Sequence, residues 1–119
     1  MTLNIQEGYF KTESEILPEI EAAGYHPVTI DFQPEKNEAH WHDFDSMVFI
    51  LDGEVSLFDE ESGEQCTVGA GTKLTAPAGV LHHEETEGYK AIVALSVKPE
   101  DLTQPVNKPP PVARKDSNI

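Results

Sequence analysis

The sequence contains a single cysteine, few basic residues and no long apolar run. With Cys66 as the one cysteine among 119 residues, no disulfide can form within the chain. No apolar stretch approaches the roughly 18 residues that a membrane-spanning helix requires. The first ten residues also lack the basic start and apolar core of a secretory signal. These absences favour a reducing interior compartment, so we expect a cytoplasmic protein.

Basic residues are scarce relative to acidic ones. Lys and Arg total 8 against 22 Asp and Glu, which gives a formal net charge of −14. A field of that sign repels phosphate backbones and anionic bilayers, and no basic stripe interrupts it. We therefore expect neither nucleic acid nor a membrane as a partner, and we attribute the acidity to a well-solvated surface.

The chain is long enough for one domain with a single hydrophobic core. Near the N-terminus, residues 14–24 predict a short helix, with Ser14 as the N-cap and Gly24 as the terminator. Pro18 fits this helix if it lies in the first turn, where the backbone N–H has no helical partner. We expect residues 1–27 to form an extension made of this helix and its adjoining loops.

The middle of the chain has the pattern of short β-strands. Residues 28–32 alternate apolar and polar side chains, which predicts a half-buried strand. Further strand-like segments are found at residues 47–52, 54–59, 65–69, 72–77 and 90–97. Turn signals separate them at intervals of roughly ten residues, and the Asp52-Gly53 pair predicts a tight hairpin. This arrangement favours an all-β sandwich or barrel over residues 28–98.

Proline is concentrated at the C-terminal end. Residues 99–119 contain five prolines and almost no apolar periodicity. Because proline lacks a backbone donor and prefers extended geometry, this segment cannot join a central strand. We expect a Pro-rich tail over these residues that is extended or disordered.

Two histidines stand directly before one of the apolar runs, in the segment AHWHDFDSMVFILDGE (39–54). His40 and His42 are two positions apart, so in an extended strand both imidazoles project to the same side. Trp41 then faces the other side, where it can pack against the N-terminal helix or a second subunit. A metal site would require at least one further ligand from elsewhere in the chain.

A candidate for that ligand lies in the segment GTKLTAPAGVLHH (71–83). Gly71, Pro77 and Gly79 precede His82 at intervals typical of a strand that ends in a tight turn. The adjacent His83 should point to the opposite face, at the surface or behind the metal ligands.

Together these segments resemble the two signature motifs of the cupin family. The second motif, Gly-x5-Pro-x-Gly-x2-His, is matched without a gap from Gly71 to His82, and the first is matched at His40, His42 and Gly53. The resemblance implies a small antiparallel jelly-roll barrel (a double-stranded β-helix) that encloses a ligand cavity. It also implies that His40, His42 and His82 meet at one divalent metal ion, and that the chain forms a homodimer.

The resemblance covers roughly residues 28–97 but departs from the family pattern at two places. Pro34 stands where the first motif usually opens with a glycine. Ser46 and Met47 stand where the usual fourth ligand, a glutamate, should be, and neither side chain replaces a carboxylate for a hard divalent ion.

Two ligand sets therefore remain open. Three histidines suffice for a facial site with free positions for water or substrate. Alternatively, Asp43 or Asp45 could enter the site through a local bulge that re-aims the strand.

The sequence gives weaker reasons to place other polar side chains in the site. We expect His26 to be an ordinary loop histidine and Cys66 to be a small buried residue. Glu84 belongs to an acidic run whose simplest interpretation is a solvated rim. However, it lies two positions after His82 and could face inward as an acid or base.

The expected function is that of a metal-binding single-domain cupin that acts on a small molecule, with a dioxygenase-like reaction preferred. The alternative is a non-catalytic cupin that binds or senses a small molecule. Imidazole ligands suit iron, zinc and nickel alike, and manganese is a further candidate, so the sequence does not identify the metal. It identifies no catalytic residue and no organic cofactor.

Overall fold

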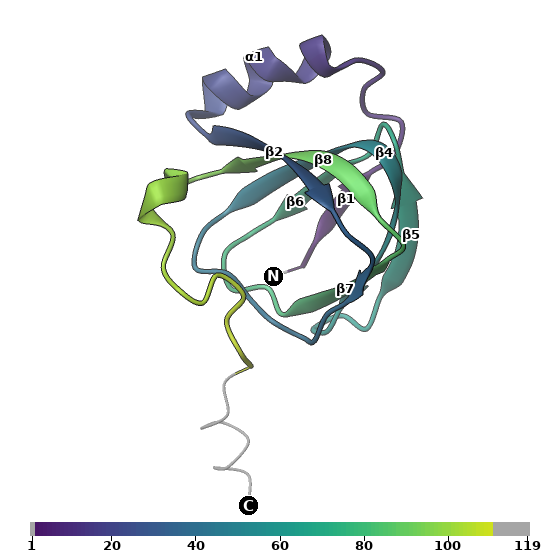
Figure 1. Cartoon of the computed structure of the whole chain (residues 1–119), viewed down its shortest axis with the longest axis vertical. Helices are drawn as coiled ribbons and strands as arrows, with labels where there is room; N and C mark the ends of the chain where they lie inside the picture. Colours follow the sequence, from purple (N-terminus) through teal and green to yellow (C-terminus); the bar gives the residue numbers. More distant parts are fainter. Residues whose placement is uncertain (1, 111–119) are drawn as a thin grey trace, which may run out of the picture.

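The computed structural model describes residues 2–110, in which eight β-strands, one α-helix and one short 3-10 helix are present (Figure 1). In chain order the elements are β1 (Asn4–Gln6), α1 (Glu13–Ala23), β2 (His26–Phe32), β3 (Glu35–Lys36), β4 (Ser46–Asp59), β5 (Gln65–Gly69), β6 (Lys73–Ala76), β7 (His82–Thr86), β8 (Tyr89–Leu95) and the 3-10 helix (Pro99–Asp101). Within the described range, no helix is long and apolar enough to cross a membrane. From Pro111 onward, the predicted Pro-rich tail lies outside the described residues.

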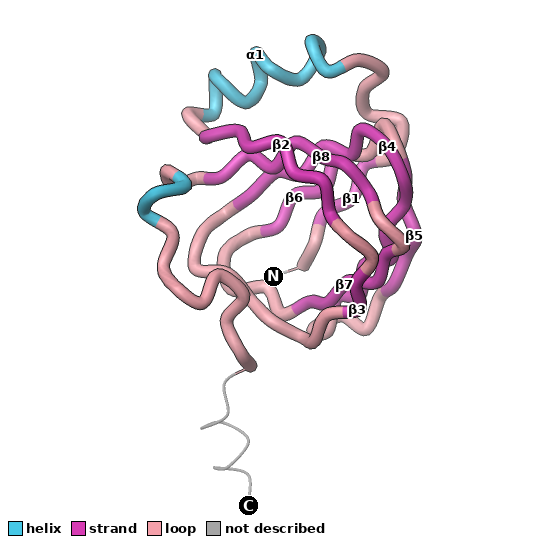
Figure 2. Tube along the Cα trace, viewed as in Figure 1, coloured by secondary structure: helices cyan, strands magenta, loops and turns pink. Residues whose placement is uncertain are grey.

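The strands pair antiparallel and form two sheets, A and B, that share β4. In sheet A the first half of β4 lies between β6 and β8, and the strand order is β1-β6-β4-β8-β2. In sheet B the second half of β4 lies between β5 and β7, and the order is β5-β4-β7-β3. The strands curve around a common interior (Figure 2). The predicted all-β antiparallel architecture with one short N-terminal helix is therefore confirmed.

The predicted hairpin at Asp52-Gly53 is wrong, because these residues lie inside one continuous strand, β4. The pairing register shifts between Ile50 and Asp52, and β4 then passes from sheet A, where Gly53 pairs with Tyr89, to sheet B, where Glu54 pairs with Gly69. Gly53 has a φ of +81°, and a Cβ placed on it would lie 2.5 Å from the carbonyl oxygen of Gly88. Glycine therefore allows β4 to bend at this corner of the barrel and to approach a neighbouring backbone closely.

Gly53→Ala is expected to lower the free energy of unfolding by about 2 kcal/mol, since it combines left-handed strain with a backbone clash. In a domain of this size the corresponding fall in Tm is roughly 8 °C, which calorimetry would measure. Gly63→Ala is the matched control, because Gly63 also has a positive φ of 77° but nothing lies within 4 Å of the added Cβ. Equal losses in the two variants would contradict a role for the close approach.

Helix α1 begins earlier than predicted, with Thr12 rather than Ser14 as its N-cap. The Glu15 carboxylate accepts a hydrogen bond from the Thr12 backbone N–H at 3.2 Å, which favours the earlier start. Gly24 ends the helix as predicted, in a left-handed conformation with a φ of 73°. Pro18 lies beyond the first turn, so its position in the helix provides no N–H for the carbonyl of Ser14.

Helix α1 packs on the outer face of sheet A (Figure 1). Ile16 and Ile20 are almost fully buried there, in one cluster with Met47 and Phe49 of β4 and Ile92 of β8. Since side chains alternate along a strand, the neighbours of these residues on β4 and β8 face the barrel interior. The helix thus covers the outside of the sheet whose inside forms part of the functional site.

The inner face of sheet A also includes strand β2, which pairs with β8 along its whole length. Val28, Ile30 and Phe32 are the half-buried members of its alternating pattern, as predicted. His26 is the first residue of this strand, opposite Leu95, and not a loop residue as expected. Inside the barrel a second apolar cluster holds the sheets together: Ile50, Val55, Leu57, Val68, Leu74, Tyr89 and Ala91.

Asp59, at the end of β4, is a buried carboxylate that joins three segments. It accepts hydrogen bonds from the backbone N–H of Leu3 at 2.9 Å, of Glu61 at 2.9 Å and of Ser62 at 3.1 Å. Burial by itself raises the pKa of this carboxyl, but the backbone donors outweigh it and hold the pKa below its ordinary value of 3.8. Asp59 also pairs with His82 across the β4–β7 ladder, so this network supports the strand that begins at His82.

We expect Asp59 to make the stability of the fold depend on pH. Because its folded-state pKa is depressed, its contribution is present above the ordinary value of 3.8 and is lost as the pH falls below that value, through the folded-state pKa. Asp59→Asn removes the titration but keeps a side-chain oxygen acceptor. The stability advantage of the wild type over this variant, measured by urea unfolding, should therefore shrink on acidification. An advantage that grows as the pH falls would contradict the assignment.

Candidate metal centre

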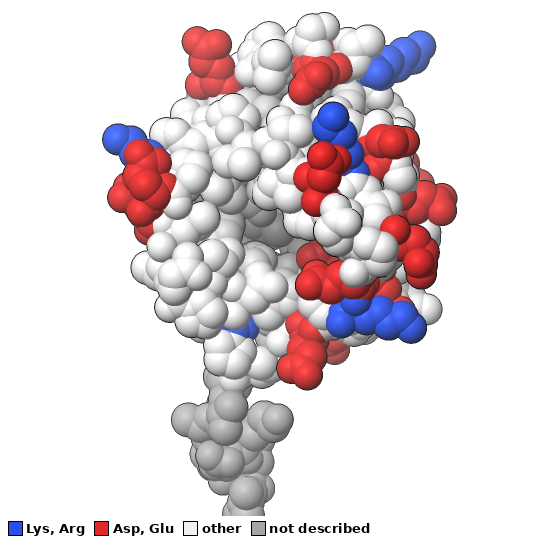
Figure 3. Space-filling view, viewed as in Figure 1, with Lys and Arg blue, Asp and Glu red and all other residues white. Residues whose placement is uncertain are grey.

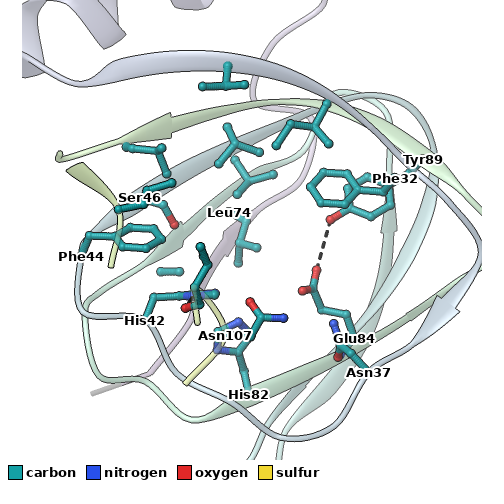
Figure 4. Close-up of a pocket in the computed structure, with 18 of the residues that line it drawn as sticks. Phe32, Asn37, His42, Phe44, Ser46, Leu74, His82, Glu84, Tyr89 and Asn107 are labelled. Carbon is teal, nitrogen blue, oxygen red and sulfur yellow. Dashed lines mark hydrogen bonds between the residues drawn. The ribbon is translucent and has the colours of Figure 1, made fainter. Parts of the chain in front are cut away.

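The interior between the two sheets holds a cavity of about 300 Å³. The face shown in Figure 3 is hollowed near its centre, and acidic side chains are more numerous on one side of the hollow. Figure 4 shows His42, Asn107 and His82 along one edge of the cavity, with Leu74 and Phe32 on other parts of its wall.

Three histidines come together at the edge of this cavity. His40, His42 and His82 each offer one ring nitrogen, and the three nitrogens lie within 4.8 Å of one another. His40 and His82 exchange two backbone hydrogen bonds, at 2.8 and 2.9 Å, which join the two histidine motifs across the barrel. The histidines of the two sequence motifs therefore lie close together in the fold. The cluster that they form is compatible with a bound metal ion.

Each imidazole is oriented by the protein backbone. Nδ1 forms a hydrogen bond with a backbone carbonyl in all three rings: His40 with Glu38 at 2.7 Å, His42 with Val106 at 2.9 Å and His82 with Val80 at 2.9 Å. A carbonyl oxygen can only accept, so these bonds require the proton on Nδ1. A neutral ring in that tautomer presents the lone pair of Nε2, which is the form in which histidine binds a metal.

The environment also favours the neutral rings. Burial lowers the pKa of His42 and His82 below the ordinary value of 6.5. The hydrogen bonds to the carbonyls of Val106 and Val80 act in the opposite direction, and the neighbouring imidazoles lower the pKa further. At neutral pH these two side chains are therefore available as lone-pair donors.

Ser46 faces the site, whereas Met47 does not. Ser46 is buried and lines the cavity together with His42 and His82. Met47 points the other way, into the apolar cluster beneath α1. Of the two positions at which the family resemblance predicts a carboxylate, only position 46 is therefore on the side of the histidines.

The two aspartates between the histidines and β4 have other partners. The hydroxyl of Thr103 donates to Asp43 at 2.6 Å, and the backbone N–H of Ala78 donates to Asp45 at 2.7 Å. Among the described residues, the cluster of ligand-type side chains consists of the three histidines. The structure thus adds no carboxylate from this segment to the cluster.

Residues 99–110, which we call the strap, lie against the barrel beside the histidines. Trp41 and Lys108 exchange backbone hydrogen bonds at 3.1 and 2.8 Å, and Trp41 Nε1 donates to the carbonyl of Pro109 at 2.8 Å. Trp41 therefore contacts the strap rather than the N-terminal helix. The segment that we expected to be an extended or disordered tail makes defined contacts here, one of which orients His42.

The strap also forms part of the cavity wall. Pro99, Leu102, Val106 and Asn107 line the cavity. Sequence analysis missed all four, because nothing in the local pattern links a Pro-rich segment to histidines some 60 positions earlier; His42 and Val106 are 64 residues apart.

The remaining candidates occupy distinct positions. Glu84 lines the cavity, which is the inward placement that the sequence left open. His83 lies on the opposite face, as predicted, where it stacks on Phe58 at 4.3 Å and pairs with Glu60. Cys66 is half-buried rather than buried, and burial and then nearby carboxylates raise the pKa of its thiol, which disfavours a reactive thiolate.

Several solved structures share this fold. An acireductone dioxygenase from Bacillus anthracis, with a cadmium ion in its active centre, aligns with a TM-score of 0.58 and 16% identity over 81% of this chain and 79% of that chain. A DUF861 family protein from Thermotoga maritima aligns with a TM-score of 0.57 and 16% identity, over 76% of this chain and 96% of that one. At these identities the likeness establishes the fold alone.

A protein of unknown function from Pseudomonas syringae, also of the DUF861 family, aligns with a TM-score of 0.56 and 18% identity over 60% of this chain. The present chain matches only 31% of the length of that protein. No curated protein matches the sequence. Residues 28–98, more than half of the chain, match the family model described as the cupin domain. The jelly-roll barrel and its histidine motifs thus have a common explanation: the chain belongs to the cupin family.

Proposed function

We propose that the chain binds one divalent metal ion through Nε2 of His40, His42 and His82, and that this centre acts on a small molecule held in the adjoining cavity. The observation that carries the proposal is the arrangement of three converging imidazoles, each with its Nδ1 on a backbone carbonyl. Such anchoring fixes the tautomer and the direction of a ligating ring before the metal arrives. A polar strand end without a metal would gain no function from this anchoring of the rings.

When bound, a divalent ion with free coordination positions would polarise an oxygen donor of the small molecule, and iron would in addition support dioxygenase-like chemistry. The residues of the chain supply the rest. The backbone carbonyls orient the imidazoles, the inner faces of the sheets give the cavity apolar walls, and the strap covers one side of it. The three-histidine set with open positions is the reason to prefer an oxygenase, and an acireductone dioxygenase with the same fold is in keeping with that reaction class.

A second candidate is a cupin that binds or senses its ligand without transforming it. One observation favours it: a serine occupies the cavity-facing position at which the family resemblance predicts a ligating carboxylate. The same three-histidine site would hold a divalent ion more tightly with a carboxylate at position 46, because the negative charge attracts the ion. Both candidates require the metal or the cavity, and they differ in whether the ligand is chemically changed.

Elemental analysis of untagged protein, purified without chelators, tests the proposal. We expect about one iron, zinc, nickel or manganese ion per chain, as three protein ligands with open positions are typical of catalytic centres. Oxygen uptake with candidate substrates would then separate the oxygenase from the binding protein. A chain that carries none of these metals and takes up none when they are added would overturn the metal centre.

We also propose that the protein is a homodimer, which analytical ultracentrifugation tests.

A further inference from the structure

The walls of the cavity away from the histidines are largely apolar. Side chains from β2, β4, β6 and β8 line it, among them Val28, Ile30, Val48, Leu74, Val93 and Leu95. A volume of about 300 Å³ accommodates on the order of ten non-hydrogen groups, at about 30 Å³ each as in liquid water. The body of a ligand that fills this space is therefore small and mainly apolar.

The charged side chains at the cavity are of one sign. None of the described lining residues is a lysine or an arginine, whereas Glu35 and Glu84 are both among them. A carboxylate or phosphate group buried here would lose its hydration without gaining an ion pair, and both glutamates would repel it. Away from the metal, the cavity therefore disfavours an anionic group.

Glu84 is placed as a hydrogen-bond acceptor for a ligand. It lies two positions after His82 on β7, so both side chains project from the same face of that strand. Its carboxylate accepts a hydrogen bond from the hydroxyl of Tyr89 at 3.1 Å, shown as a dashed line in Figure 4. The amide oxygen of Asn37 accepts from the Glu84 backbone N–H at 2.7 Å. These contacts fix the position of Glu84, and one donor leaves most of the acceptor capacity of a carboxylate free.

The hydroxyl of Tyr89 acts as a hydrogen-bond donor to Glu84 and does not replace it as the acceptor for a ligand. Burial, and then the nearby Glu84 carboxylate, raise the pKa of the Tyr89 hydroxyl, so it keeps its proton and donates that proton to Glu84. Tyr89 also stacks on Phe32, with ring centroids 4.4 Å apart, which fixes its ring. Glu84 is thus a cavity-lining carboxylate that is held in place and still has acceptor capacity for a ligand.

We infer that the ligand is a small, mainly apolar molecule that coordinates the metal through oxygen at one end and donates a hydrogen bond to Glu84 at the other. Its second end is a hydroxyl, an amine or an amide N–H, and not a carboxylate or a phosphate. The inference rests on the proposed metal centre, because the histidine end of the cavity is where the oxygen donors bind. Glu84 then acts in ligand selection.

Three catechols that share one chelating end test the inference. Dopamine carries a cationic donor at the far end, 4-ethylcatechol carries an apolar chain and protocatechuate carries a carboxylate. Their affinities for the zinc-loaded protein can be measured by calorimetry, since zinc has no redox chemistry that would oxidise them. We expect dopamine to bind at least about tenfold more tightly than protocatechuate, as charge-assisted hydrogen bonds are the strong ones. The affinity of 4-ethylcatechol should lie between those of the other two.

Two variants test whether Glu84 causes this order of affinities. Glu84→Gln should bring the three affinities within about threefold of one another, because the amide keeps the shape but not the charge. Glu85→Gln is the matched control, since Glu85 follows on the same strand but faces outward near Lys36, and it should leave the order unchanged. Tightest binding of protocatechuate to the wild type, or an order that Glu84→Gln does not alter, would overturn the inference. Failure of zinc itself to bind would overturn the metal centre and the inference together.

Discussion

His82→Ala is expected to bind zinc at least about 100-fold more weakly than the wild type. Structural zinc sites with four ligands gain about 10–16 kcal/mol, which is roughly 3 kcal/mol per ligand and corresponds to a factor of about 100. His82 is one of three imidazoles whose ring nitrogens lie within 4.8 Å of one another, and the remaining pair cannot form a facial site. Competition with a chromogenic chelator would measure the change.

His83→Ala is the control for this experiment. It removes an imidazole from the next position of the same strand, but that ring stacks on Phe58 and pairs with Glu60 on the far side. We expect its zinc affinity to stay within about twofold of the wild type, since the contacts it loses are exposed ones. Circular dichroism would show that both variants keep the barrel. A His82→Ala protein with unchanged metal content would mean that His82 is not a ligand.

The histidine cluster could be predicted from the sequence because each step depends on short-range geometry. His40 and His42 share a face through the two-residue period of a strand. Pro77 and Gly79 then determine where the turn before His82 falls, and the resemblance to the cupin motifs supplied the pairing of the two segments. The structure joins them by the backbone bridge between His40 and His82.

The barrel strands were only partly predictable, for a physical reason. An Asp-Gly pair between apolar runs has the same local signature whether the chain reverses or bends. At Gly53 the outcome depends on the backbone of Gly88, which approaches from 35 positions away in the sequence and leaves no space for a Cβ. The short strands β1 and β3 were missed as well, because two or three residues are too few to show a period.

The strap was not predictable from its composition. Proline removes backbone donors, so a Pro-rich segment cannot form a ladder, and this suggested a free tail. The strap instead uses single contacts: the Trp41–Lys108 bridge, the indole of Trp41 on Pro109 and the carbonyl of Val106 on His42. The contacts of Pro109 and Val106 each need only a carbonyl, and the bridge uses the N–H and the carbonyl of Lys108, which is not a proline.

Ser46→Glu is expected to raise the affinity for zinc or manganese by about 100-fold, since a fourth protein ligand contributes roughly as much as each of the other three. Position 46 is buried and faces the cavity beside His42 and His82, so a longer side chain has space on the side of the histidines. The carboxylate adds negative charge to a site that otherwise has three neutral ligands. Competition with a chelator at a fixed pH would measure the gain.

The metal-free form of Ser46→Glu should be less stable than the metal-free wild type, because an unpaired carboxylate is buried until the ion neutralises it. Metal should therefore raise the Tm of this variant more than it raises the Tm of the wild type. Met47→Glu is the matched control, since Met47 faces the cluster beneath α1; it should lose stability and gain no metal affinity. If Ser46→Glu bound metal no better than the wild type, position 46 would not be a vacant ligand position. The three-histidine arrangement would then be a complete site rather than the remnant of a four-ligand one.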